Sequence, residues 1–368
     1  LSGGIDSASL LALYGLSRDG SESEIHTYSW IPPPSTEEEA NYSEWKWSNE
    51  LAKRHGAEHH FVQANADDIF NLLRVHDLGL GDTSDTWSEH CVRCDAQSRN
   101  IRLLMSGWGG DQFISHYGTD VYAEAFFTGR IVRTLAEISS IARKSKQPIR
   151  RFLSILYRNI LMRAASAGIR GNYSPTRAPL PDFSHFAHED IKANVRPLKL
   201  HTAYQGLSLR SQQLCDFQRA HLCNRLRSWA ATGRRFGLSY VFPLLDKRVV
   251  ELALQIPPRF YMQQGIGRYV FRLAIDSLLP SEVCWANLKY EPRRVSLLNS
   301  SRVKALKRWL DECGDDYSSS SVIDLEMLKR EIALLNERSA PKTRSGVLLM
   351  MSMQRSVLLA NLEAKYGF

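Results

Sequence analysis

The first residues of the chain have the composition of a loop that binds phosphate. The run Leu1-Ser2-Gly3-Gly4-Ile5-Asp6-Ser7 precedes an apolar helical pattern. Its two glycines let the backbone approach an anion closely, and amides at the start of a helix lack helical partners, which a phosphate could replace. A carboxylate there would repel a bare phosphate, so Asp6 indicates a bridging Mg²⁺. The run predicts magnesium-dependent nucleotide chemistry; the alternative is a turn in which Asp6 and Ser7 only cap the helix.

A second glycine-rich run, Ser106-Gly107-Trp108-Gly109-Gly110-Asp111, directly follows the apolar strand pattern of residues 101–105. Before it, helix and strand patterns alternate: a helix from Asp6, a strand at 25–30, a helix at 36–55 and a strand at 58–62. This alternation predicts an α/β fold with a parallel sheet that is covered by helices on both faces. Ligands of such sheets bind at the carboxyl ends of the strands, where both glycine-rich runs are expected to lie.

Four segments, in this order, resemble signatures of the asparagine synthetase superfamily. Two are the glycine-rich runs at residues 2–7 and 106–111. The others are Pro243-Leu244-Leu245-Asp246, with the helix start that follows it, and Gly267-Arg268-Tyr269-Val270-Phe271-Arg272, with Leu278-Leu279-Pro280 leading to Lys289. The resemblance covers residues 1–289. It implies the PP-loop fold of the adenine nucleotide alpha hydrolase-like type, a parallel sheet flanked by helices, with a mainly helical carboxyl-terminal portion.

The resemblance also implies an adenylating amide ligase. ATP would activate a carboxylate as an acyl-adenylate, pyrophosphate would leave and an amine would attack. Asp6 and Asp111 match the residues that hold Mg²⁺, and Lys289 matches a catalytic lysine that stabilises the oxyanion. The positions that match contacts to ATP and its pyrophosphate are Ser2, Gly3, Gly4, Ser7, Ser106 and Gly107. Arg268 stands where the family usually has a phosphate-binding lysine, and its guanidinium fork suits phosphate oxygens.

Three positions distinguish branches of the superfamily. Trp108 stands where asparagine synthetase has an acidic residue, and Ser239 and Val241 replace an acid-x-Arg pair. Because a buried aspartate substrate needs charged partners, a different substrate is indicated. Tryptophan cannot accept a proton, as the tyrosine of β-lactam-forming relatives does. The chain looks most like the lasso peptide cyclases, which join an Asp or Glu side chain of a precursor peptide to its amino terminus. The alternative is asparagine synthetase or another asparagine synthetase-like amidotransferase.

The organisation predicted from the patterns is an ATP-binding α/β part at residues 1–120 and a helical part at 121–368 that completes the active site. Residues 166–199 are rich in Gly, Pro, Ser and His and are interpreted as an irregular loop, either a lid or a linker. The first residues already form the turn that follows a strand, so a strand is expected upstream of Leu1. A glutaminase-like domain could also precede it.

Composition limits the remaining functional classes. The formal charge of +8 favours anionic partners. The clustered basic residues are interpreted as solvated helix faces; they are Arg130, Arg133, Arg143, Lys144, Lys146, Arg150 and Arg151. No apolar run is long enough to span a membrane. The expected partners are the precursor peptide and the maturation protease of the same pathway. Nucleic acid is not expected, because no base-stacking aromatic module is present. A non-catalytic ATP-binding scaffold remains a further alternative.

Cysteine and histidine spacing gives only weak signals. Six cysteines over 368 residues favour reduced thiols and a cytoplasmic location. Cys91 and Cys94 form a Cys-x-x-Cys pair without a second pair at zinc-finger spacing, so a metal or redox role is the less favoured interpretation. The histidines, including His59, His60 and His185, show no His-Glu-x-x-His spacing. The absence of a Gly-x-x-x-x-Gly-Lys-Ser/Thr motif disfavours a P-loop kinase.

Overall fold

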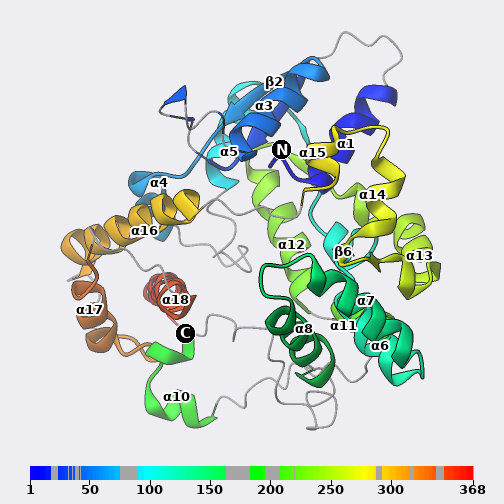
Figure 1. Ribbon diagram of the computed structural model, residues 1–368. Coiled ribbons are helices and arrows are strands. Elements are labelled where there is room, and N and C mark those ends of the chain that lie inside the picture. Colours follow the sequence, from blue (N-terminus) through cyan, green and yellow to red (C-terminus); the bar gives the residue numbers. More distant parts are fainter. Residues whose placement is uncertain are drawn as a thin grey trace.

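A computed structural model describes residues 1–17, 24–31, 33–34, 36–37, 41, 43–74, 89–162, 183–194, 208–218, 220–286, 292–314, 319–336 and 344–367. In these residues the chain is mixed α/β, mostly helical, with short strand pairs (Figure 1). The helices around α18 (Arg344–Tyr366) form one side of the molecule in this view. The elements around α1 (Ile5–Ser17) and α14 (Tyr269–Ile275) form the other.

Most elements predicted in the amino-terminal part are confirmed. The helix from Asp6 is α1, and the strands at 25–30 and 58–62 are β1 (Ile25–Ser29) and β2 (Ala57–Phe61). The helix predicted over 36–55 is α3 (Ser43–Arg54), which begins later than expected. Two further helices are α4 (Ala66–Leu73) and α5 (His90–Ser98). Asn65 caps α4 by accepting a hydrogen bond from the Asp68 amide at 2.9 Å.

Two strand pairs are parallel. β1 pairs with β2 in a register that sets His26 against Glu58 and Tyr28 against His60. β3 (Leu103–Met105) is shorter than the predicted strand and pairs with β4 (Ser239–Val241), a strand from the part of the chain predicted to be helical. The sequence patterns missed β4 because three residues are too few to show an alternating pattern. β4 brings the segment before Pro243 to the carboxyl end of β3.

From residue 110 onward the described residues are mainly helical; the sequence predicts a helical part from residue 121. Up to residue 218 the elements are η3 (Gly110–Gln112), α6 (Val121–Phe127), α7 (Ile131–Arg143), α8 (Pro148–Leu156), η4 (Tyr157–Leu161), η5 (Phe183–Phe186), α10 (Glu189–Asn194) and α11 (Leu209–Gln218). They are followed by α12 (Ala220–Arg235), η6 (Pro243–Leu245), α13 (Lys247–Gln255), η7 (Pro258–Phe260), the antiparallel pair β5 (Met262–Gln263) and β6 (Ile266–Gly267), α14, α15 (Ser281–Cys284), α16 (Pro292–Cys313), α17 (Leu325–Ala333) and α18.

Five apolar cores join the described elements. The first unites α4 with α16, α17 and α18 around Trp309 and Leu328. The second joins Ile5 and Leu11 of α1 to Phe271 and Ile275 of α14, and extends to α15. Because burial of these side chains holds α1 against α14, the amino-terminal ends of both helices are fixed relative to each other. The loop of residues 2–7 and Arg268, which were predicted to bind the phosphates, lie at these two helix ends.

Other expectations are met in part. Of the irregular segment 166–199, residues 183–194 contain η5 and α10, and the rest lies outside the described residues. The five cysteines whose side chains the structure describes are free thiols, and the basic residues on α7 and α8 are mostly exposed. Within the described residues, no helix combines the length and apolarity that a membrane crossing requires.

Candidate active site

The loop of residues 2–7 is braced by its own polar groups. Gly3 has a φ of 65°, in the left-handed region that favours glycine. The Ser2 amide donates to Oγ of Ser7 at 3.2 Å, and Ser7 Oγ donates to the carbonyl of Gly4, also at 3.2 Å. The Ala8 amide donates to the Gly4 carbonyl at 2.9 Å and begins the helical pattern. The Ser7 hydroxyl is therefore engaged within the loop, while the Asp6 carboxylate contacts a residue outside it.

Asp6 forms an ion pair with Arg268, the residue that directly precedes α14. Nη1 of Arg268 donates to Oδ2 of Asp6 at 2.6 Å, and both side chains are largely buried. Arg268 occupies the N-cap position of α14 with a φ of 59°. A non-glycine residue in the left-handed region costs roughly 1 kcal/mol or more, and such strain is concentrated at functional sites. Here the strained backbone accompanies a guanidinium that lies against the loop of residues 2–7.

The second glycine-rich run, which we call turn 106–111, packs directly on this loop. A Cβ added at Gly107 would lie 2.8 Å from the carbonyl carbon of Asp6 and 2.8 Å from the nitrogen of Ser7. The side-chain-free position is therefore required by the close approach of two backbones. Ser106 donates its amide to the Val241 carbonyl at 3.0 Å and accepts a hydrogen bond from the Trp108 amide at 3.2 Å. β4 thus holds the start of the turn.

The end of the same turn brings Asp111 towards Asp6. Gly109 has a φ of 95°, and a Cβ on Gly110 would lie 2.6 Å from Cδ1 of Leu244 and 3.2 Å from Oδ1 of Asp6. The next residue is Asp111. Desolvation by the surrounding protein raises the pKa of its carboxyl, the Asp6 carboxylate raises it further, and Arg268 opposes the rise. The two acids, about a hundred positions apart in sequence, therefore interact electrostatically.

These residues suit a divalent cation. Oδ1 of Asp6 is buried and makes no hydrogen bond within the described part of the chain. A buried acceptor without a partner is costly, and like charge is already raising the pKa of Asp111. A Mg²⁺ ion would give Oδ1 of Asp6 a partner and would offset the repulsion between the Asp6 and Asp111 carboxylates, because hard cations prefer carboxylate oxygens. The donor set fits the ion that the sequence predicted.

Pro243-Leu244-Leu245-Asp246 supports turn 106–111 from the other side. A Cβ on Gly109 or Gly110 would meet the side chains of Leu245 or Leu244, respectively. Asp246 caps α13 by accepting from the Arg248 amide at 2.9 Å, and the Arg248 guanidinium lowers the pKa of Asp246 to about 2. The sequence predicted that this segment starts a helix. In the structure it also packs against Gly109 and Gly110.

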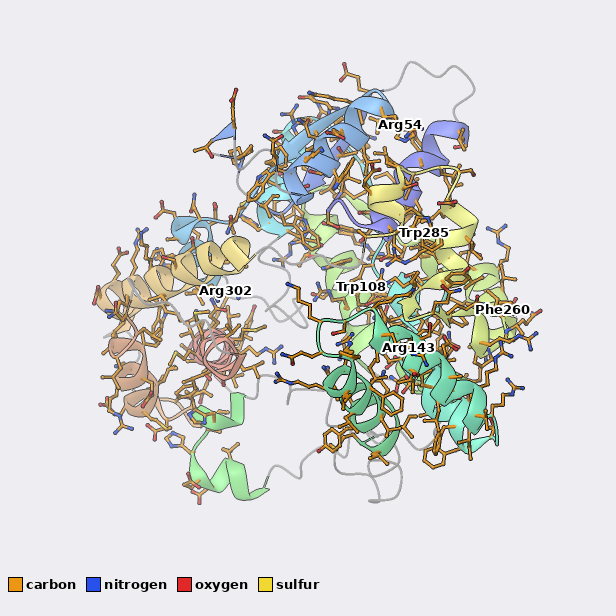
Figure 2. The ribbon with its side chains drawn as sticks, in the orientation of Figure 1. Arg54, Trp108, Arg143, Phe260, Trp285 and Arg302 are labelled. Carbon is orange, nitrogen blue, oxygen red and sulfur yellow. The ribbon has the colours of Figure 1, made fainter. Side chains whose placement is uncertain are left out.

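Trp108 lies near the centre of the molecule, beside α12 (Figure 2). Its ring makes edge contacts with Trp229 and Phe242, at centroid distances of 5.6 and 6.2 Å. The Arg225 guanidinium lies 5.6 Å from the Trp108 ring and 4.8 Å from the Trp229 ring. Trp108 is therefore part of an aromatic cluster with a cation over it, and part of its surface remains open.

No separate role for Arg272 was predicted from the sequence, although it lies within a matching segment. Its guanidinium is buried and donates to three carbonyls: Gly267 at 2.9 Å, Ala286 at 3.0 Å and Cys284. Arg272 therefore ties the residue before Arg268 to the segment that leads towards Lys289. Lys289 itself lies outside the described residues. The signal in the sequence that could have pointed to Arg272 is its position one helical turn after Arg268.

The Cys-x-x-Cys pair shows no sign of thiol chemistry. Cys91 donates to a carboxylate oxygen of Asp68 at 3.3 Å, and burial raises the pKa of its thiol to about 12. Burial also raises the pKa of Cys94. Because the thiolate is the reactive and metal-binding form, these shifts disfavour a redox or metal role at neutral pH.

A model of the family described as Asparagine synthase matches residues 1–358 of the chain. Curated proteins gave no match to it.

Proposed function

The chain belongs to the asparagine synthase family, and on that basis we propose that it forms a macrolactam in a precursor peptide. The family consists of AMP-forming carbon–nitrogen ligases, whose chemistry is ATP-dependent adenylation followed by amide formation. Its fold is of the adenine nucleotide alpha hydrolase-like type. In the proposed reaction, a side-chain carboxylate of the peptide attacks the α-phosphorus of ATP and pyrophosphate leaves. The peptide's amino terminus then attacks the acyl carbon, and AMP leaves.

The observation that carries the catalytic part is the meeting of Asp6, Arg268 and turn 106–111. The loop of residues 2–7 would bind the pyrophosphate, and Ser106 and Gly107 would contact the nucleoside. Asp6 and Asp111 would hold Mg²⁺, which when bound supplies charge neutralisation at the phosphates. The Arg268 guanidinium would bind phosphate oxygens, and Lys289 would stabilise the oxyanion when the amine attacks.

The peptide as substrate is supported by what surrounds this site. Ser239 is exposed and Val241 is partly buried on β4, where a small acidic substrate would need charged partners. Opposite them on β3, Leu103 and Met105 are about half exposed, at 50% and 48%. Together with the partly open Trp108 ring, these apolar surfaces suit a larger and less polar substrate than aspartate. The maturation protease of the same pathway is the proposed protein partner.

The proposal is tested by incubating the protein with Mg-ATP and candidate precursor peptides. The expected result is a peptide lighter by one water, with one AMP and one pyrophosphate formed per ring. Asp6→Asn should abolish ring formation, and the exposed-site control Asp311→Asn should keep it. If the protein instead forms asparagine from aspartate with ammonia or glutamine, its substrate is aspartate and the macrolactam proposal is refuted. Full activity of the Asp6→Asn variant would refute the assignment of this site to catalysis.

A further inference from the structure

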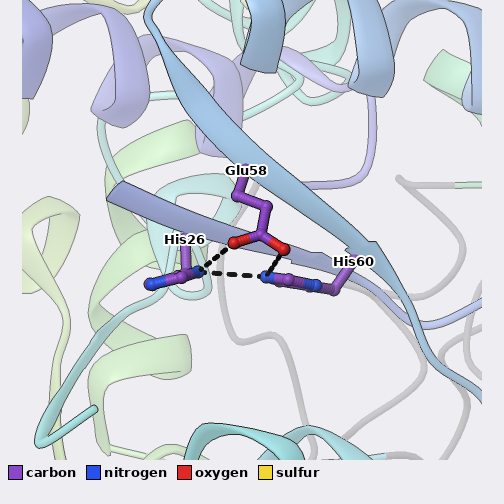
Figure 3. Close-up of side chains that lie close together, drawn as sticks. All are labelled: His26, Glu58 and His60. Atoms are coloured by element: carbon purple, nitrogen blue, oxygen red, sulfur yellow. Dashed lines mark hydrogen bonds and ion pairs between the residues drawn. The ribbon is translucent and has the colours of Figure 1, made fainter. Parts of the chain in front are cut away.

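A cluster of three side chains on the β1–β2 pair lies outside the candidate active site. His26 and Glu58 face each other across the two strands, and His60 follows Glu58 by two positions, so that all three lie on one face (Figure 3). Within the described residues, this is the group of three potential ligand residues whose donor atoms all lie within 4.8 Å of one another. Their contacts involve neither Asp6 nor Arg268.

The distances between the donor atoms are those of ligands around one small cation. Nδ1 of His26 is 3.1 Å from Nε2 of His60 and 3.4 Å from Oε2 of Glu58, while Oε1 of Glu58 is 3.8 Å from Nε2 of His60. Donors about 2.0–2.1 Å from a tetrahedral zinc ion stand about 3.3 Å apart. Small side-chain adjustments therefore suffice to bring all three onto one ion.

Neutral imidazoles can supply two of the donor atoms. In a neutral imidazole, the ring nitrogen without a proton carries one lone pair that can bind a metal ion. A metal ion held here would take that lone pair from Nδ1 of His26 and from Nε2 of His60, and the other nitrogen of each ring would carry the proton.

Neighbouring groups orient the ligands in the way that is common around metal sites. Nε2 of His26, on the far side of its ring, lies 3.7 Å from a carboxylate oxygen of Glu24. Nη1 of Arg99 donates to Oε1 of Glu58 at 3.3 Å, and Nε of Arg99 is held by Asp95 at 2.8 Å. Three carboxylates and one guanidinium thus surround the two histidines and leave a net negative charge. Such outer contacts fix the tautomer and orientation of ligands.

The opposite face of the strands provides an internal contrast. His59 points to that face, where Thr27 Oγ1 lies 2.7 Å from its Nδ1 and Ser29 Oγ lies 3.1 Å from its Nε2. Both ring nitrogens of His59 are therefore engaged by hydroxyls, whereas one nitrogen of His26 and one of His60 lie close to the Glu58 carboxylate.

We propose that His26, Glu58 and His60 bind a divalent transition-metal ion, with Zn²⁺ as the best match. Two imidazoles and one carboxylate are a preferred donor set for this ion, and a water molecule would complete a tetrahedral shell. The ion cross-links β1 to β2. Because the Leu1 nitrogen donates to the Tyr28 carbonyl and Ser29 Oγ donates to the Leu1 carbonyl, the cross-link also steadies the strand against which the loop of residues 2–7 begins.

Zinc binding to the chelator-treated full chain tests the proposal. Titration calorimetry and elemental analysis should show one high-affinity Zn²⁺ per chain, and Co²⁺ should give the visible bands of a tetrahedral site. Glu58→Gln should weaken Zn²⁺ affinity at least about 100-fold, and Glu24→Gln by about tenfold. Glu58 is 55% exposed, so its amide variant should keep the fold; His26→Gln provides a second removal of a ligand.

Matched controls separate this site from other possible ligands. Glu50→Gln makes the same change at an exposed position of the adjacent α3 and should leave Zn²⁺ affinity unchanged. Cys94→Ser removes the thiol beside His90, 3.5 Å away, and should also leave it unchanged. Wild-type affinity in folded Glu58→Gln or His26→Gln, loss of binding in Cys94→Ser, or no stoichiometric binding by the wild type would each overturn the proposal.

Discussion

Gly107 is a position in the candidate active site where added volume would press on backbone atoms. An alanine Cβ there would lie 2.8 Å from two backbone atoms, the carbonyl carbon of Asp6 and the nitrogen of Ser7, and 3.1 Å from the Asp6 Cβ. Extending the 2.8 Å contacts to 3.4 Å, where ordinary van der Waals contact begins, requires a backbone shift of about 0.6 Å. Neither partner is a flexible side-chain end, so the loop or the turn itself must move.

The expected consequence of Gly107→Ala is twofold. Overpacking of this kind costs about 1–3 kcal/mol of stability. A displacement approaching 1 Å at a positioning element costs up to about 100-fold in function. We therefore expect the dissociation constant of Mg-ATP to rise about 10- to 100-fold, which corresponds to about 1.4–2.7 kcal/mol.

Calorimetric titration with Mg-ATP and urea unfolding measure these two effects on the same protein. Gly314→Ala is the matched control, since its new Cβ would meet only the end of the Leu310 side chain at 3.3 Å. That variant should bind Mg-ATP as the wild type does. Wild-type affinity and stability of Gly107→Ala would refute the packing of turn 106–111 on α1. Lost stability with unchanged Mg-ATP affinity would refute the assignment of this contact to the nucleotide site.

The other predictions concern three buried or half-buried charged groups. Arg268→Ala should weaken Mg-ATP binding by about tenfold or more, because it removes a charge-assisted contact, whereas Arg268→Lys should keep most of it; the same titration measures both. Arg272→Lys has a single nitrogen in place of the three that bind the three carbonyls, so it should cost about 2–3 kcal/mol in urea unfolding and lower the ligation rate more than Mg-ATP affinity. Burial raises the pKa of Glu89 to about 7, so the folded protein holds its proton more tightly than the unfolded chain does, and its contribution to stability is lost as pH rises from about 4.5 to about 7. Unfolding of Glu89→Gln, which can still accept from Arg93, should lose that slope; an unchanged slope would contradict the assignment.

The sequence by itself determined the glycine-rich runs, the acids within them and their order along the chain. These are local features: Gly3 and Gly109 were marked by residue type, and both have positive φ in the structure. The helix starts near Asp6 and at Asp246 were likewise predictable, because caps and apolar periodicity are read within a few residues. The family and its ligase chemistry followed from these segments.

The tertiary structure decided which of these residues meet. Arg268 and Asp6 are 262 positions apart, and they touch because apolar burial packs α1 on α14. The strand β4 is too short to show an alternating pattern, and only its non-local pairing with β3 makes it a strand. His26 and His60 gave no metal signal at a separation of 34 residues; only the parallel register of β1 and β2 brings them together. Residue type and local spacing are set along the chain, whereas convergence depends on packing and strand register, which no short segment contains.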